Sequence, residues 1–254
     1  MSGSGDIRST MEIFAEVIGP ARTDVVFQPI VDLSRRTLFA VEALARCRVP
    51  GLESPSVLFE DAVAKGYCGR LGRMIRELTV KRVGDDVPVF TNVHPDELTQ
   101  RWLIRPDDPI YSHQNDVYIE ITESVPFSHF DLCVSMLREI QSRGNVHLVI
   151  DDLGAGYSNL QRIVDLAPSI VKLDMQLVRG IDRLPRKQKL IKSIVSMCSD
   201  QGARVVAEGI ETAPELMAVI DAGVQLGQGY LLARPAYPIP AITWPEAVTT
   251  KPAR

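Results

Sequence analysis

Six short apolar runs of this chain each end in a polar residue that could bind a metal ion or move a proton. These residues are Glu42, Asn92, Glu120, the pair Asp151 and Asp152, Lys172 and Glu208. Most of the intervals between them fit one unit of strand, loop and helix. In an α/β barrel, residues at the carboxyl ends of successive parallel strands meet at one face, where such barrels do their chemistry. The pattern therefore predicts one shared site.

The residue types at these strand ends predict that the site depends on metal ions. Five carboxylates and an amide on one face would repel one another strongly unless cations lie among them. Oxygen ligands of this kind are the ones that Mg²⁺ and Mn²⁺ prefer. Two adjacent aspartates suit a pair of divalent ions, because one carboxylate can bridge both ions while its neighbour binds the second.

Strand geometry decides which side chains can reach the same space. Side chains alternate along a strand, so Glu42, Leu44 and Arg46 share one face. This places a guanidinium that could bind phosphate beside a carboxylate that could bind metal. On a regular strand Asp151 and Asp152 would point apart, but the glycines in the loop that follows would let the chain turn sharply and bring both to one site.

Each of these residues also has an ordinary structural explanation. A lone carboxylate at a strand end is usually a helix cap or part of a surface ion pair. Lys172, among the expected cations, would be biased toward its neutral form and could orient or deprotonate a water molecule. It could instead simply neutralise Asp174 or an acid on the next strand. His94 and His113 lack a partner at metal-ligand spacing, so we interpret them as structural or surface residues.

The hydrophobic pattern predicts the elements that would position the site. Strands are expected at 24–33, 37–46, 87–93, 117–122, 146–152, 169–174, 203–209 and 224–235. Helices are expected at 11–18, 56–66, 70–83, 95–103, 130–144, 187–202 and 213–223. The first two strands are close enough in sequence to pair directly. The first strand would then run antiparallel to its neighbour, which departs from a regular (βα)8 barrel.

Composition limits the class of protein. The chain has 254 residues, of which 45% are hydrophobic, which suits one large barrel. A net charge of −4 argues against a broad basic surface for polymeric nucleic acid, and no apolar stretch approaches the length of a membrane span. Four scattered cysteines without a CxxC pair favour reduced, buried thiols in a cytoplasmic protein. We expect one barrel domain over 21–245, preceded by a segment at 1–20 with a short helix and followed by a tail at 246–254.

Taken in order, the motifs of the chain resemble those of the EAL domain, the cyclic di-GMP phosphodiesterase family. The run Glu42-Ala43-Leu44, with Arg46 after it, resembles the signature that names the family. The resemblance covers about residues 22–238. Its other motifs are FQPIVDL at 27–33, TNVHP around Asn92, YIEITES at 118–124, IDDLGAGYSNL at 150–160, VKLD at 171–174, AEGIET at 207–212 and QGYLLARP at 228–235. Seven or more ordered motifs are far more specific than a single three-letter match.

The resemblance implies a modified TIM barrel with an antiparallel first strand. It implies hydrolysis of one phosphodiester bond of cyclic di-GMP, which yields linear pGpG, with two Mg²⁺ or Mn²⁺ ions. By motif match, the ligands of the first ion would be Glu42, Asn92, Glu120 and Asp151. Asp151 would bridge the ions, and Asp152, with Glu208 directly or through water, would serve the second ion.

The resemblance also implies roles in catalysis, substrate binding and regulation. Lys172 would hold the attacking water, and we expect Glu42 and Glu208 to take part in catalysis with it. The residues that would contact or frame the dinucleotide are Gln28, Leu44, Arg46, Asp174 and Gln228. The residues that would brace the loop after Asp152 are Glu123 and Glu211. In this family that loop couples dimerisation to metal binding, so a homodimer is expected.

The chain departs from the family pattern at a few positions. Leu153 and Ala155 stand where Phe and Thr are common, His94 stands where Ser is common, and VKLDM replaces the usual KID-R. None of these changes removes a metal ligand. A silent family member that binds cyclic di-GMP as a receptor is the alternative, but silent members typically lose a metal ligand or the signature glutamate. An unrelated metal-dependent barrel hydrolase or lyase would fit the strand-end pattern alone, although the ordered motifs argue against it.

Overall fold

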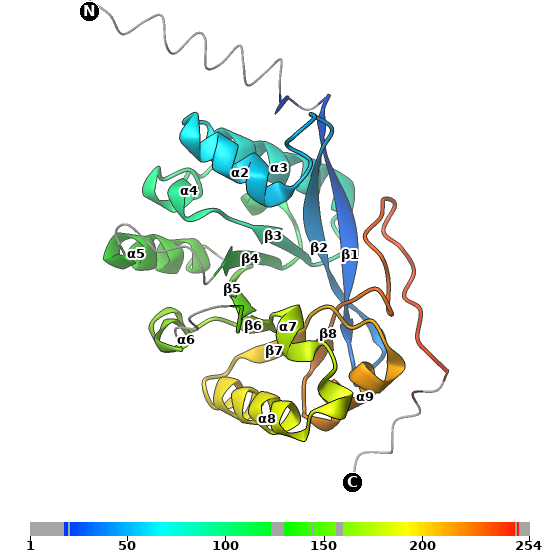
Figure 1. Cartoon of the computed structure of the whole chain (residues 1–254). Coiled ribbons are helices and arrows are strands. Elements are labelled where there is room, and N and C mark those ends of the chain that lie inside the picture. Colours follow the sequence, from blue (N-terminus) through cyan, green and yellow to red (C-terminus); the bar gives the residue numbers. More distant parts are fainter. Residues whose placement is uncertain are drawn as a thin grey trace, which may run out of the picture.

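Eight strands close into a barrel in the order β1 to β8 in the computed structural model of the chain (Figure 1). The structure describes residues 18–19, 21–122, 130–143, 145–155, 160–246 and 248. The strands are β1 (Thr23–Asp32), β2 (Thr37–Cys47), β3 (Val89–Asn92), β4 (Val117–Thr122), β5 (Val146–Leu153), β6 (Ile170–Leu173), β7 (Arg204–Ala207) and β8 (Leu226–Gly227). The predicted modified α/β barrel is therefore confirmed.

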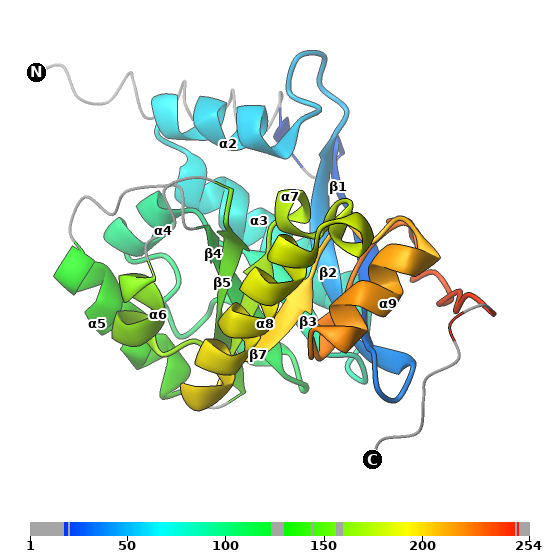
Figure 2. The ribbon, with the colours of Figure 1, turned by 60° about the horizontal axis from the view of Figure 1, so that its bottom comes forward.

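Helices cover the outside of the barrel. They are α2 (Pro55–Ala64), α3 (Cys68–Val83), α4 (Pro95–Thr99), α5 (Phe130–Gln141), α6 (Gln161–Leu166), α7 (Met175–Val178), α8 (Pro185–Asp200) and α9 (Ala213–Asp221). Two 3₁₀ helices, η2 (Pro109–Ser112) and η3 (Ile181–Arg183), complete the described elements. Figure 2 shows α7, α8 and α9 on one side of the barrel. No helix among the described residues is both long enough and apolar enough to cross a membrane.

The first strand runs antiparallel to both of its neighbours, as predicted. It pairs with β2 and with β8, whereas the pairs from β2 to β8 are all parallel. The connection from β1 to β2 is short, and Asp32 accepts hydrogen bonds from the backbone of Ser34 and Arg35 within it. This hairpin sets Gln28 directly opposite Glu42. A residue from the reversed strand therefore reaches the same end of the barrel as the strand-end acids.

The interior of the barrel is filled by one apolar layer, separate from the core that lies between strands and helices. Its buried members are Ile30, Ala40, Phe90, Tyr118, Val149, Ile170, Val206 and Leu226. Phe90 and Tyr118 stack there with ring centroids 4.4 Å apart. Each member lies two residues from a predicted site residue on the same strand or directly after it, as Phe90 does from Asn92. Because side chains alternate along a strand, the site residues form the next layer inside the barrel.

Some predicted boundaries were wrong. The helix expected over 95–103 ends at Thr99, where the chain turns and Arg101 takes a left-handed conformation with φ of 57°. The strand expected over 224–235 contains only Leu226–Gly227. After it the chain turns at Gly229, where a Cβ would lie only 2.1 Å from the backbone of Ile210. The helix expected over 11–18 lies almost wholly outside the described residues.

Several predicted structural residues are buried as expected. The four cysteines are free and buried, which agrees with the reading of reduced thiols. His113 is buried and lies 3.0 Å from the carbonyl oxygen of Val87. His94 accepts a hydrogen bond from the backbone of Asp96 at the start of α4. Both histidines therefore have structural contacts.

Candidate active site

The polar layer at the carboxyl end of the barrel is centred on Lys172. Its side chain is 1% exposed, and carboxylates from four different strands or strand ends surround its ammonium group. The distances from Lys172 Nζ are 2.6 Å to Glu120, 2.7 Å to Glu208, 3.3 Å to Asp151 and 3.5 Å to Glu42. The structure therefore brings together the strand ends that the sequence predicted would meet.

The expectation of a neutral Lys172 applies to a site with bound cations, and the carboxylates alone have the opposite effect on its charge. Burial alone would lower the pKa of Lys172, but the surrounding carboxylates, Asp151 first, raise that pKa well above its usual value. Asp174 plays no part in this cage, because its carboxylate caps α7 by accepting a hydrogen bond from the backbone of Gln176 at 2.7 Å. Without bound cations, Lys172 is an ammonium group that neutralises acids on neighbouring strands.

Burial has the opposite effect on the pKa values of the nearby carboxylates, which it raises because it favours their protonated forms. Burial, together with the charge of Asp151, raises the pKa of Asp152 to about 6. Burial raises the pKa of Glu208 to about 8, although Lys172 opposes the shift. Burial also raises the pKa of Glu120 well above its usual value. One ammonium group is therefore too little positive charge for these acids, and the site favours either protons or further cations.

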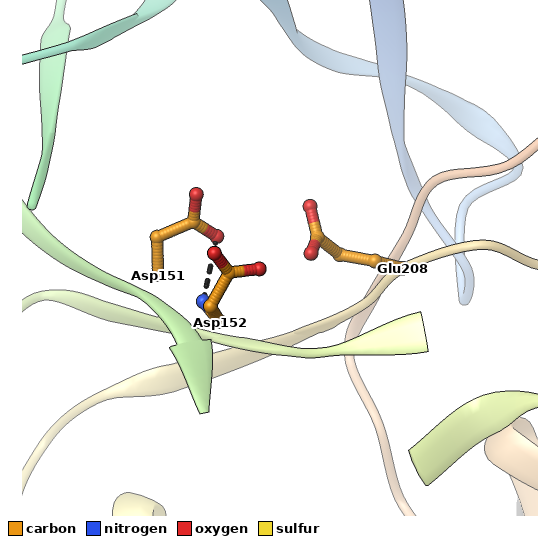
Figure 3. Close-up of side chains that lie close together, drawn as sticks. All are labelled: Asp151, Asp152 and Glu208. Carbon is orange, nitrogen blue, oxygen red and sulfur yellow. Dashed lines mark hydrogen bonds between the residues drawn. The ribbon is translucent and has the colours of Figure 1, made fainter. Parts of the chain in front are cut away.

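Asp151, Asp152 and Glu208 form the group of carboxylates that is best placed to share a metal ion (Figure 3). Each offers an oxygen atom, and these atoms all lie within 4.8 Å of one another. Figure 3 shows Glu208 pointing toward the aspartates from another strand. The three carboxylates have the oxygen chemistry that a divalent ion prefers.

A break in β5 explains how two adjacent aspartates reach one site. The pairing of β5 with β6 shifts between Ile150 and Leu153, and Asp152 has a φ of 60°. The backbone N–H of Asp152 donates to Asp151 Oδ1 at 2.9 Å. The sharp turn that the sequence placed in the following glycines therefore begins at Asp152 itself. This left-handed conformation is uncommon for a residue other than glycine, although aspartate adopts it more readily than most.

Amide side chains connect the acids to one another. Asn92 Nδ2 donates to Glu120 at 3.0 Å and to Glu42 at 3.4 Å. Gln228 Nε2 donates to Glu42 at 2.5 Å and to Gln28 at 3.1 Å. These bonds hold Glu42 between β3 and the end of β8. As a metal ligand, Asn92 would have to present its amide oxygen in place of this nitrogen.

Two cavities, each of about 490 Å³, have the aspartate pair in their walls. The first, here called the acidic cavity, has walls that include Gln28, Glu42, Asp174, Glu208 and Gln228. The second, here called the aromatic cavity, has walls that include Asn92, Phe59 and His94. Phe59 and His94 stack with ring centroids 6.1 Å apart. Leu44, Asp151 and Asp152 line both cavities.

Three predicted site residues are not part of this cluster. Arg46 donates to the carbonyl oxygen of Ala45 at 2.8 Å. Arg46 is not among the described residues that line the two cavities. Glu123 lies outside the described residues. Glu211 lines the acidic cavity and pairs with Arg179, while most of the loop that it was expected to brace lies outside the described residues. The roles of all three stay predictions.

The sequence reasoning missed some residues that line the cavities. Tyr230 lines the acidic cavity and follows Gln228 by two residues, so the QGYLLARP motif contained a signal for it. Arg179 also lines that cavity, but it lies beyond the end of α7, far from any strand end. Phe59 lies on α2, where its helical spacing resembles that of ordinary core residues.

The raised pKa of Glu208 predicts how metal-free protein responds to pH. Between its ordinary value of 4.5 and its folded value of about 8, Glu208 binds a proton in the folded state that it loses in the unfolded state. This proton stabilises the fold fully below pH 4.5, and the stabilisation is lost as pH rises through about 8. We therefore expect the melting temperature in excess chelator to fall between pH 6 and pH 9.

Thermal melts of two variants would check this assignment. Glu208→Gln should show a smaller fall than the wild type, whereas Glu139→Gln, which changes a surface partner of Arg143, should follow the wild type. Added Mn²⁺ should stabilise the wild type more at pH 9 than at pH 6, since an ion must displace the protons of its ligands. A Glu208→Gln curve that matches the wild type in chelator would contradict the assignment.

Comparisons with known proteins agree on one family. The model of the EAL domain matches residues 18–235 of the chain. Cyclic di-GMP phosphodiesterase RocR of Pseudomonas aeruginosa is 31% identical over 235 residues, which cover 84% of this chain and 57% of RocR. Cyclic di-GMP phosphodiesterase PdeR of Escherichia coli is 29% identical over 218 residues, which cover 81% of this chain and 32% of PdeR. The chain thus spans between about a third and somewhat over half of these relatives.

A solved structure is similar over most of the chain. The manganese and cyclic di-GMP complex of BlrP1 from Klebsiella pneumoniae superposes with a TM-score of 0.73 and 29% identity. The superposition covers 87% of this chain and 57% of the BlrP1 chain.

Proposed function

Because the chain belongs to the EAL domain family, we propose that it is a metal-dependent phosphodiesterase that hydrolyses cyclic di-GMP to linear pGpG. The observation that carries this proposal is the convergence of the acids around one buried lysine at the carboxyl end of the barrel. The complexes and names of the relatives supply the substrate class. The strand-end residues supply the chemistry that such a reaction needs.

The donor atoms of the site fit a pair of divalent cations. The site contains five carboxylates, those of Glu42, Glu120, Asp151, Asp152 and Glu208, and the ammonium group of Lys172. With all five carboxylates ionised, four negative charges would lack a counter-charge, and two divalent ions would supply it. Glu120 is fully buried, and Lys172 Nζ lies 2.6 Å from its Oε1. The proposed ligands of the first ion are Glu42, Asn92, Glu120 and Asp151, and those of the second are Asp151, Asp152 and Glu208. Bound divalent ions would lower the pKa of a water molecule and neutralise charge on the phosphodiester.

The residues of the chain would prepare the water and hold the substrate. Lys172 Nζ would hold the attacking water by a hydrogen bond. Glu208 lies 2.7 Å from Lys172 Nζ and could accept the proton that the water loses. Gln28 and Gln228 join Glu42 in the acidic cavity and would frame the substrate. Arg46 would contact a substrate phosphate after its side chain leaves the carbonyl of Ala45.

The shape of the site suits a dinucleotide. A cyclic dinucleotide carries one base on each side of the phosphodiester bond that is cut. Asp151 and Asp152 line both cavities, and each cavity has a volume of about 490 Å³. A phosphate held at the aspartates could therefore place one base in each cavity.

Incubation with cyclic di-GMP tests the proposal. With Mg²⁺ or Mn²⁺ we expect pGpG as the product, and excess chelator should abolish turnover until the ion is restored. Ca²⁺ should bind but support turnover poorly, because it is larger and less demanding of octahedral geometry. Full activity in chelator would contradict the metal-dependent mechanism. Binding of cyclic di-GMP without pGpG formation would favour the receptor alternative.

A further inference from the structure

A charged pair lies on the wall of the acidic cavity, apart from the residues that would hold metal. Arg179 follows α7 and Glu211 precedes α9, and Arg179 Nη2 lies 3.2 Å from Glu211 Oε1. Both residues line the cavity that contains Asp151 and Glu208. Among the described residues that line this cavity, Arg179 is the single cation. The pair therefore offers a hydrogen-bond donor and an acceptor side by side.

The backbone around this pair is firmly held. Glu215 is buried, and its carboxylate accepts hydrogen bonds from the backbone N–H of Gly180 at 2.8 Å and of Glu211 at 3.1 Å. One side chain thus ties together the two segments that carry the pair. Lys187 also donates to the carbonyl oxygen of Arg179 at 2.7 Å. Arg179 and Glu211 project from fixed points, which lowers the entropy lost when they bind a ligand.

Stability does not account for the pair. The side chains of Arg179 and Glu211 are 62% and 48% exposed, and exposed ion pairs contribute little to folding. An aromatic ring lies on the same cavity wall, since Tyr230 lines the cavity and is 51% exposed. The guanidinium of Arg234 lies 4.3 Å from the centroid of this ring. A flat base could pack against Tyr230 while its edge meets the charged pair.

Resting on the proposed function, we propose that Arg179 and Glu211 recognise the Watson–Crick edge of one guanine of the substrate. Guanine presents O6, an acceptor, next to N1–H and the N2 amino group, which are donors. Arg179 can donate to O6, while Glu211 can accept from N1–H and N2. Adenine presents a donor at N6 and an acceptor at N1, so the same pair would meet adenine with mismatched groups. The pair would therefore select guanine over adenine in the acidic cavity.

Steady-state kinetics and calorimetry of single variants test this inference. The variants are Arg179→Met and Glu211→Gln, with Arg183→Met as the matched control, since Arg183 is exposed and pairs with Asp182. The substrates are cyclic di-GMP, cyclic di-AMP and bis(p-nitrophenyl) phosphate, which has no base. For Arg179→Met we expect kcat/KM for cyclic di-GMP to fall about tenfold relative to that for bis(p-nitrophenyl) phosphate, the lower range for loss of a bidentate base contact. The same relative kcat/KM should also fall in Glu211→Gln.

The preference between bases gives a second readout. The ratio of kcat/KM for cyclic di-GMP to that for cyclic di-AMP should fall about tenfold in Arg179→Met and stay unchanged in Arg183→Met. If the wild type binds but does not hydrolyse, the same ratios are taken from dissociation constants. If the wild type is active and Arg179→Met leaves these kcat/KM ratios unchanged, the inference is overturned while the proposed function stands. A wild type that neither binds nor hydrolyses cyclic di-GMP would overturn the proposed function and the inference together.

Discussion

Asp151→Asn is expected to reduce the rate of cyclic di-GMP hydrolysis by at least about 10²-fold, the loss seen when a preorganised electrostatic contact is removed from an active site. The substitution keeps the shape of the side chain but removes a negative charge from the centre of the acid cluster. Asp151 is buried, lies 3.3 Å from Lys172 Nζ and accepts a hydrogen bond from the backbone of Asp152. No other proposed ligand contributes to both ions, so neither ion would keep its full ligand set.

The matched control is Asp116→Asn, immediately before β4 and therefore at the opposite end of the barrel. Asp116 is 45% exposed and pairs with His147 at 3.0 Å. Its substitution should change the rate by no more than about twofold, as is usual for surface changes. Circular dichroism of both variants would check the fold, and product analysis would measure pGpG. A folded Asp151→Asn variant with the rate of the wild type would refute the assignment of this residue.

Lys172→Met is expected to lose turnover by about 10²-fold or more, the range for a group that handles a proton in the reaction. Methionine keeps much of the length and the apolar stem of the side chain but lacks the nitrogen that would hold the attacking water. Binding of cyclic di-GMP, measured by calorimetry with the metal ion present, should stay close to that of the wild type. A loss of rate without a loss of binding marks an interaction that acts in the transition state.

The structure adds a consequence for metal-free Lys172→Met. Removal of the ammonium leaves Glu120, Glu208 and Asp151 without their shared counter-charge, and breaking a buried ion pair from one side is strongly destabilising. The melting temperature in chelator should therefore fall, and added Mn²⁺ should restore more stability to this variant than to the wild type. Lys65→Met is the control, since Lys65 pairs with Asp61 on the surface of α2. If Lys172→Met turns over cyclic di-GMP at the normal rate, Lys172 does not hold the attacking water and only balances charge.

The barrel and the convergence of its strand ends could be predicted because both depend on short-range patterns. A buried strand places residues i and i+2 on the same face, so the polar residue at the end of each apolar run was expected to reach the shared face. The structure shows the apolar layer beneath, as with Phe90 below Asn92. The short connection after β1 likewise predicts its antiparallel pairing, because only a hairpin can close over so few residues. These features need no knowledge of distant contacts.

Contacts between distant segments decided what the sequence could not. The left-handed Asp152 depends on the shifted pairing of β5 with β6, and no local motif predicts that shift. The short β8 depends on the close approach of Gly229 to Ile210 across the loop after β7. Arg179 and Glu211 meet because Glu215 ties their two segments together.

Lys172 shows most clearly the difference between what the sequence predicts and what the tertiary structure decides. From the sequence, its place at a strand end was evident, and the expectation of nearby cations argued for a neutral amine. Without bound cations, the structure surrounds it with four carboxylates, which raise the pKa of Lys172. The sequence by itself determined which chemical groups reach the carboxyl end of the barrel, because strand periodicity is local. Only the closed barrel decided their mutual distances and hence their charges, because electrostatic interactions depend on separation and burial in three dimensions.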